Sequence, residues 1–211
     1  FTSMNEQILF FQQYTKFQSF EPDLSISIKP RPISKLKHGI ELRNLSFRYN
    51  NKTPLILKDI NLFIPAKESL ALVGKNGSGK TTLVKLLTRL YDPTEGQILW
   101  DGIDIKEFDI NEYRQHIGVI FQDFAHYDLT ARENIGLGQV SEINNLSYIQ
   151  EIARITDMHE YIQSLPQKYE TSLSRWLAIN GNGTDLSGGQ WQKIAISRML
   201  MRRADFMILD E

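Results

Sequence analysis

The chain has 211 residues, which is enough for one large domain or two small lobes with a substantial core. Its 24 Lys and Arg against 25 Asp and Glu give a net charge of -1, so no basic excess exists to clamp a nucleic-acid backbone. A hydrophobic fraction of 41% excludes a disordered chain, and no apolar run approaches the roughly 20 residues of a membrane span. The absence of cysteine excludes disulfides, thiolate catalysis and cysteine zinc sites.

The N-terminal region is predicted to be a helix followed by a linker. Apolar side chains recur at three- and four-residue spacings in Asn5–Phe20, which favours an amphipathic helix. Three prolines keep the next stretch, Glu21–His38, extended. Phe1 opens the chain without a secretion signal, and Glu211 closes it directly after an apolar run. We therefore expect a fragment of a longer polypeptide.

Strand patterns follow the linker. Two-residue alternation predicts strands in the stretches 40–49, 56–64 and 98–105, and Asp101-Gly102 predicts a hairpin turn in the last of them. Short continuous apolar runs predict strands buried on both faces of a parallel sheet. These runs are Leu70–Val73, Ile117–Ile120 and Phe206–Leu209.

Helical patterns separate these strands. Leucines at helical spacing run from Leu83 to Leu90, and Asp92-Pro93 is expected to end that helix. The stretch 130–165 is mostly helical and opens with a capping box of Thr130 and Glu133. Strand, helix and strand in alternation predict an α/β core with a helical insert.

A glycine-rich segment between a predicted strand and a predicted helix fits the pattern G-x-x-x-x-G-K-[ST]. It consists of Gly74, Lys75, Asn76, Gly77, Ser78, Gly79, Lys80 and Thr81. Glycines let backbone N–H groups turn toward an anion, and the helix N-terminus adds the positive end of its dipole. Lys80 supplies a positive charge and Thr81 offers a hydroxyl to Mg²⁺. The segment is predicted to bind nucleotide phosphates, against the alternative of a simple tight turn.

Two carboxylates, Asp210 and Glu211, follow the last predicted strand. In phosphate-loop ATPases an Asp at this place holds Mg²⁺, and a following Glu orients or deprotonates the attacking water. Alone, such a pair is more often a solvated strand end, but a phosphate loop upstream favours the catalytic interpretation.

Another helix start carries a second anion-binding pattern. Leu186–Gln190 opens a helical run in which Ser187 and Gln190 form a Ser-x-x-Gln capping box. Gly188 and Gly189 lower the stability of the first turn, but they leave its backbone N–H groups uncovered by side chains. Uncovered N–H groups at a capped helix start predict an anion site. One nucleotide needs only one phosphate loop. The second helix end therefore suits the site of another copy.

The order of these motifs resembles the nucleotide-binding domain of an ATP-binding cassette (ABC) protein over residues 40–211. It comprises the phosphate loop, Gln122, Leu186–Gln190 and Asp210-Glu211. The resemblance implies a head-to-tail dimer, with ATP between the phosphate loop of one copy and the Ser187 helix of the other. It also implies that Tyr49 stacks on adenine and that Gln122 reaches Mg²⁺ and the attacking water.

The expected site residues fall into three groups, and the cofactors are ATP and Mg²⁺. Catalysis is assigned to Glu211, Lys80 and Gln122. Nucleotide binding is assigned to Tyr49, to the whole segment from Gly74 to Thr82, namely the eight motif residues and Thr82, and to Ser187, Gly188, Gly189 and Gln190. Metal binding is assigned to Thr81, Gln122 and Asp210.

The domain order resembles an exporter half-transporter. Residues 1–20 are expected to be the cytoplasmic end of the last transmembrane helix, 21–38 a linker and 39–211 the ABC domain. The expected fold class is α/β: a phosphate-loop ATPase core with a mostly parallel sheet and flanking helices, an antiparallel β-subdomain, and a helical subdomain at about 123–186. The partners are a second such domain and the transmembrane domain of the same polypeptide, with no nucleic acid. The location is the cytoplasmic face of the plasma membrane.

The segment from Arg175 to Lys193 resembles bacterial exporters of peptides, including lantibiotic exporters, so the expected cargo is a peptide or a lipid-like molecule. Many exporters have Arg where this chain has Trp191. Family members also continue past Glu211 to a switch His, which none of the four histidines supplies. His38, His116, His126 and His159 are expected to be surface or structural. The truncated chain should therefore bind ATP but hydrolyse it poorly.

Other functions remain alternatives. A non-transport ABC ATPase with a regulatory or nucleic-acid-related role shares the same motifs, although the stretch 123–186 is too short for the long coiled coil of DNA-repair members. A phosphate-loop kinase or GTPase shares Gly74–Thr81. A GTPase also needs Asn-Lys-x-Asp downstream, whereas Asn51–Pro54 lies upstream and lacks the Asp.

Overall fold

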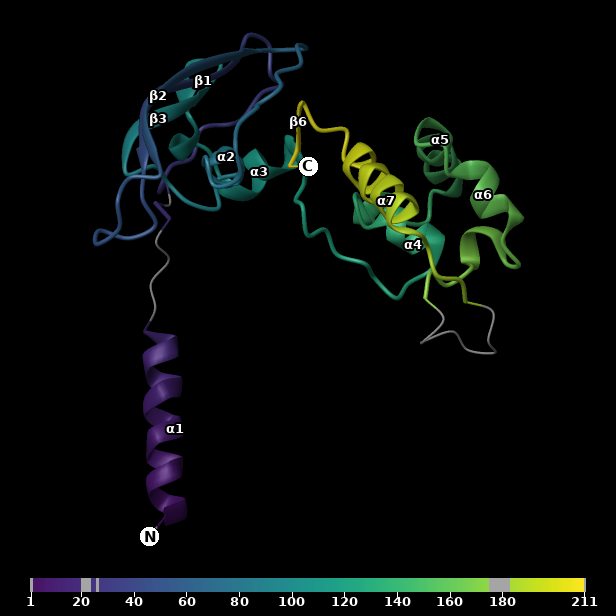
Figure 1. The fold of residues 1–211 in the computed structure, drawn as a ribbon, viewed down its shortest axis with the longest axis horizontal. Helices are drawn as coiled ribbons and strands as arrows, with labels where there is room; N and C mark the ends of the chain where they lie inside the picture. Colours follow the sequence, from purple (N-terminus) through teal and green to yellow (C-terminus); the bar gives the residue numbers. More distant parts are fainter. Residues whose placement is uncertain (1, 20–23, 26, 175–182, 211) are drawn as a thin grey trace.

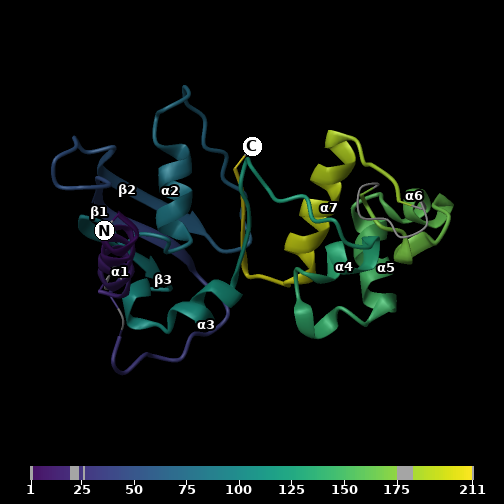
Figure 2. The same ribbon diagram turned by 90° about the horizontal axis from the view of Figure 1, so that it is seen from below.

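The computed structural model describes residues 2–19, 24–25, 27–174 and 183–210. Figure 1 shows a β-lobe and a helical lobe on either side of a central pair of strands, with the first helix projecting away from the β-lobe. Figure 2, turned by 90°, shows the same separation into two lobes. The predicted site residues are divided between them.

Four strands form an antiparallel sheet within the described β-lobe, in the order β2-β1-β3-β4. The strands are β1 (Gly39–Phe47), β2 (Leu57–Pro65), β3 (Glu95–Trp100) and β4 (Ile103–Asp104). Ile40 of β1 is paired with Ile64 on one side and Trp100 on the other, and all three side chains are buried. The predicted strands and the hairpin turn are confirmed. Asp101 and Gly102 both have positive φ, at 48° and 86°, as a type I′ turn requires.

One core face of this lobe is covered by the helix that follows the glycine-rich segment. The helical elements of the lobe are α2 (Lys80–Leu87), η1 (Ile105–Glu107) and α3 (Ile110–Gln115). Leucine spacing places the buried Leu83, Leu86 and Leu87 on the inner side of α2. The helix ends at Leu87, before the expected Asp92-Pro93 stop, because Arg89 turns the chain with φ at 52°.

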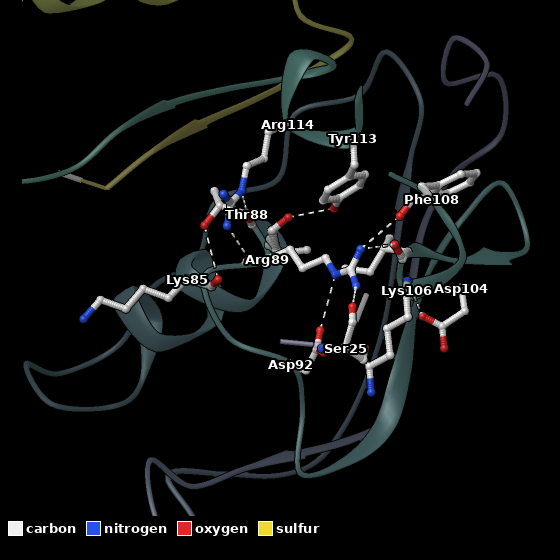
Figure 3. A network of polar contacts seen from close by, with 12 residues as sticks. Ser25, Lys85, Thr88, Arg89, Asp92, Asp104, Lys106, Phe108, Tyr113 and Arg114 are labelled. Carbon is white, nitrogen blue, oxygen red and sulfur yellow. Dashed lines mark hydrogen bonds and ion pairs between the residues drawn. The ribbon is translucent and has the colours of Figure 1, made fainter. Parts of the chain in front are cut away.

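A buried guanidinium holds this end of α2 (Figure 3). Arg89 is 1% exposed, and its Nη1 donates to the carbonyls of Ile105 (3.0 Å) and Phe108 (3.2 Å). Its Nε lies 3.4 Å from Asp92 Oδ1, and its Nη2 donates to the carbonyl of Ser25. The charge is therefore compensated by one carboxylate and three carbonyls, as burial of a cation requires.

Two side chains of α3 complete this network. The Tyr113 hydroxyl donates to the carbonyl of Leu87 (2.7 Å), and Arg114 Nη2 donates to the carbonyl of Arg89 (2.7 Å). Carbonyls at a helix C-terminus lack partners within the helix, so these bonds satisfy groups that burial would otherwise leave unpaired. Burial raises the pKa of Tyr113, which keeps its hydroxyl a donor.

The predicted linker is extended but attached to the β-lobe. Arg31 N donates to the carbonyl of Glu107 (2.8 Å), and Trp100 Nε1 donates to that of Ser34 (3.0 Å). Asp101 then accepts from three successive backbone N–H groups at residues 37–39. Burial raises the pKa of Asp101, but these three bonds outweigh it and lower the pKa overall. The described part of the linker is thus a strap along the domain.

The central strands β5 (Ile117–Ile120) and β6 (Phe206–Leu209) are parallel and in register. Both were predicted, but the expected double-sided burial is wrong for β6, where Met207 is 39% and Leu209 60% exposed. The expected strand at Leu70–Val73 is also wrong. This run pairs with no strand of the described chain, and its Val73 is 93% exposed. Ser69–Leu72 and β6 line the same cavity of about 670 Å³ without hydrogen-bonded pairing between them, so the run lacks the neighbouring strand that a ladder needs.

The helical lobe forms around its own apolar cluster. Its elements are α4 (Ala131–Gly136), η2 (Val140–Glu142), α5 (Leu146–Ile155), α6 (His159–Ser164), η3 (Lys168–Glu170) and α7 (Gly188–Met201). The predicted capping box begins α4: Thr130 Oγ1 accepts from Glu133 N (3.1 Å), and Glu133 Oε2 accepts from Thr130 N (2.9 Å). Ile149 of α5 and Ile194 of α7 are fully buried together in this cluster.

The predicted N-terminal helix is α1 (Thr2–Gln18). Its aromatic side chains are exposed, with Phe10 at 73% and Phe17 at 72%. No helix in the described part of the chain is both long enough and apolar enough to cross a membrane.

Replacing Arg89 with Ala should lower the free energy of unfolding by about 3–5 kcal/mol, because Asp92 loses its cation and three carbonyls lose a donor. Urea denaturation followed by circular dichroism measures the change. Arg43→Ala is the matched control, since Arg43 pairs with Glu41 at the exposed surface and its loss should leave the midpoint nearly unchanged. A midpoint for Arg89→Ala equal to that of the unmodified chain would contradict this role for the network.

Candidate functional site

The glycine-rich segment forms a loop that turns into α2. Gly77 and Gly79 have φ of 81° and 95°, a region that side chains other than glycine rarely adopt. A Cβ on Gly79 would also lie 2.8 Å from Leu57 Cδ2. Within the loop, Ser78 N donates to the carbonyl of Lys75 (3.1 Å), and Lys80 Nζ donates to that of Gly74 (2.9 Å). The loop is therefore closed on itself, with the Lys80 charge at its edge.

A cavity of about 510 Å³ lies beside this loop. It is lined by Ile56, Asn76, Gly77, Gly79, Lys80, Thr81, Thr82, Gln122 and Asp210. Gln122 follows β5 and Asp210 follows β6, so parallel pairing brings both strand ends to the same edge. The structure thus gathers a cation, a hydroxyl, an amide and a carboxylate from segments far apart in the sequence.

The oxygen atoms at one end of the cavity fit a divalent cation. Thr81 Oγ1 donates to Asp210 Oδ1 (3.3 Å). Asp210 is 7% exposed, and its Oδ2 is buried without a hydrogen-bond partner. An unpartnered buried carboxylate oxygen is costly unless a cation or water completes it. Carboxylate, hydroxyl and amide oxygens are the ligand types that Mg²⁺ prefers, so the donor set matches.

Tyr49 does not line the cavity but is next to Thr82, which does, and it belongs to an aromatic cluster that the sequence did not predict as a whole. Its ring meets Phe47 and Tyr91 edge-on, with centroids 5.0 Å and 5.2 Å apart. Its hydroxyl lies 3.3 Å from Thr82 Oγ1, and Lys85 Nζ lies 5.6 Å from the ring centroid. Tyr49 as a whole residue is 41% exposed, so it is accessible to a planar ligand.

The second predicted anion site lies in the helical lobe. The Ser187 capping box at the start of α7 is confirmed: Gln190 N donates to Ser187 Oγ (3.3 Å), and Ser187 N donates to Gln190 Oε1 (2.8 Å). Gly188 and Gly189 are exposed, and a Cβ on either would meet nothing within 4 Å. None of these four residues lines the cavity beside the phosphate loop.

Two predicted features lie outside the described residues. Glu211 is one, and the start of the exporter-like segment, Arg175–Leu177, is the other.

Comparisons with known proteins identify the family of the chain. The family model described as "ABC transporter" matches residues 57–211. The subtilin transport ATP-binding protein SpaT of Bacillus subtilis is 39% identical over 96% of this chain and 32% of its own length. ABC transporter B family member 29 of Arabidopsis thaliana, a chloroplastic protein, is 37% identical over 85% of this chain and 27% of its own length.

A solved structure shows the same fold. The bacterial Atm1-family ABC exporter with ATP bound superposes with a TM-score of 0.86 at 26% identity, covering 98% of this chain and 35% of that one. The chain spans about a third of the curated relatives it matches. The α/β fold is that of the ABC ATPase domain, and the chain belongs to the ABC transporter family.

Proposed function

We propose that the chain is the motor domain of an ABC exporter, in which MgATP-driven dimerisation powers the export of a substrate across a membrane. The observation that carries the proposal is the division of the site. The cavity joins Lys80, Thr81, Gln122 and Asp210, whereas Ser187 is exposed at a helix start in the other lobe. Such a site is completed by a second copy rather than by the same chain.

The phosphate loop and Tyr49 are proposed to bind ATP. The loop's backbone N–H groups and the N-terminus of α2 attract the phosphates, and Lys80 exchanges its bond with the Gly74 carbonyl for a phosphate oxygen. The partly open ring of Tyr49 contacts the base through its face. The chain holds the nucleotide at both ends.

Thr81, Asp210 and Gln122 are proposed to hold Mg²⁺. The ion, when bound, neutralises charge that develops on the phosphate oxygens. Asp210 Oδ2 supplies the unpartnered carboxylate oxygen, and the Gln122 amide reaches the same cavity from the end of β5. Glu211, the next residue, is assigned the orientation of the attacking water.

The exposed Ser187–Gln190 start of α7 is proposed to face the nucleotide of a second copy in a head-to-tail dimer. Its capping box keeps the helix start intact while Gly188 and Gly189 leave the backbone N–H groups accessible. Hydrolysis by the separate chain is therefore expected to be slow, because its own cavity lacks these donors.

The proposed setting is the cytoplasmic face of the plasma membrane. Residues 1–20 would continue a transmembrane domain of the same polypeptide, with the linker at 21–38 leading into the ATPase. Relatives that are about three times longer support this order. The relative named for subtilin transport favours a peptide as cargo.

Lys80→Ala in the full-length transporter should weaken ATP binding about tenfold, because the cavity beside the loop loses the positive charge proposed to bind the phosphates. Titration with ATP followed by calorimetry measures the affinity. Lys58→Ala, an exposed cation of β2, is the control and should bind normally. Unchanged affinity in Lys80→Ala would count against the phosphate-binding role.

Asp210→Asn should weaken the binding of MgATP by about tenfold, which removes most of the affinity that Mg²⁺ adds. The affinity for metal-free ATP should stay nearly unchanged. Paired titrations with and without Mg²⁺ separate the two effects. Asp157→Asn removes an exposed carboxylate in the helical lobe and should alter neither value. A full Mg²⁺ effect in Asp210→Asn would place the metal elsewhere.

Glu211→Gln in the full-length transporter should stop hydrolysis while ATP still binds, so the two ATPase domains should stay closed at saturating MgATP. Distances between spin labels on the two domains report closure. Domains that remain apart under these conditions would argue against ATP-driven dimerisation.

A further inference from the structure

An exposed histidine stacks on a buried tryptophan beside the Ser187 helix start. The rings of His126 and Trp191 lie 4.4 Å apart at an angle of 6°. Trp191 is 8% exposed and belongs to the apolar cluster of the helical lobe, whereas His126 is exposed in the segment between β5 and α4. An exposed side chain seldom keeps a parallel ring contact unless the segment carrying it is held in place.

The neighbours of His126 are also fastened to α7. Arg198 donates through Nη1 to the carbonyl of Ala125, and its guanidinium lies 4.8 Å from the ring centroid of Tyr127. Asn134, fully buried, donates to the carbonyl of Tyr127 (3.0 Å) and accepts from Arg198. Residues 125, 126 and 127 therefore contact α7, each through a different interaction.

This fastening joins the two halves of the divided site within one chain. Trp191 lies one helical turn after Ser187, and its backbone N–H donates to the Ser187 carbonyl (2.9 Å). His126 lies four residues after Gln122, which lines the cavity beside the phosphate loop. A movement of the start of α7 would therefore shift Trp191, and through the stacked rings it would shift His126 and the segment that carries Gln122.

We propose that the His126–Trp191 stack is a positioning contact that couples Gln122 to the Ser187 helix start, so that a nucleotide held by the partner's site sets the reactivity of this chain's own site. The inference rests on the proposed function. His126 touches neither nucleotide nor metal and acts through Gln122. Of the three contacts that residues 125–127 make with α7, this one is nearest to Ser187 along the helix, since the other two are made by Arg198.

The first test measures ATP hydrolysis by the full-length transporter in lipid nanodiscs. His126→Ala should lower kcat about tenfold and leave KM for ATP within about twofold, because misplacement of a positioning group affects the reacting geometry more than binding. His126→Phe keeps an aromatic stack and should restore kcat to within about twofold. His126→Asn keeps a polar side chain but has no aromatic ring, so it should behave like His126→Ala. His38→Ala, another exposed histidine, should leave both constants unchanged.

The second test is a double-mutant cycle with Gln122→Ala. If His126 acts through Gln122, the tenfold effect of His126→Ala should disappear in the Gln122→Ala background. A loss that arises from general destabilisation would instead multiply with the Gln122→Ala loss. Full activity in His126→Ala, or an undiminished effect in the cycle, would overturn the inference alone. Absence of Lys80-dependent hydrolysis in the unmodified transporter would overturn the proposed function and the inference with it.

Discussion

The buried guanidinium of Arg89 is the contact on which the geometry of the phosphate loop depends. Its side chain donates hydrogen bonds to the carbonyls of Ile105 and Phe108, at the two ends of η1, and to that of Ser25 in the strap. Asp92 balances its charge. Because a helix is stiff over two turns, holding its last residues sets the direction of its first. Lys80, the first residue of α2, is therefore aimed by a network at the opposite end.

The chain crosses from the β-lobe to the helical lobe and back, and the outward crossing begins at a cavity residue. The outward crossing leaves the end of β5 through Gln122, whereas the return crossing enters β6 beside the start of β5, and Asp210 follows only at the far end of β6. A small apolar cluster of Ile120, Ala195 and Met199 packs β5 against α7 at this place. A rotation of the helical lobe would act on this cluster first. The Gln122 amide therefore lies where a motion of the helical lobe would reach the cavity most directly.

Local chemistry explains which parts of the structure were predictable from sequence. The Thr130 and Ser187 capping boxes and the Asp101-Gly102 turn depend on residues three or fewer positions apart, so their spacing alone specifies the geometry. Leu70–Val73 shows the limit. An apolar run records a preference for burial, whereas strand formation also needs a hydrogen-bonding neighbour, which lies elsewhere in the chain.

The same distinction applies to the divided site. Motif order placed Lys80 and Ser187 in an ATPase and could identify Trp191 as unusual for its position, yet it could not find the partner of that ring. The contact between His126 and Trp191 depends on how the segment after β5 lies across α7, which is a property of packing between distant elements. Since the stack needs only a flat ring at each position, the pair could change together without altering any motif. Coupling of this kind can therefore vary among proteins that share every catalytic residue.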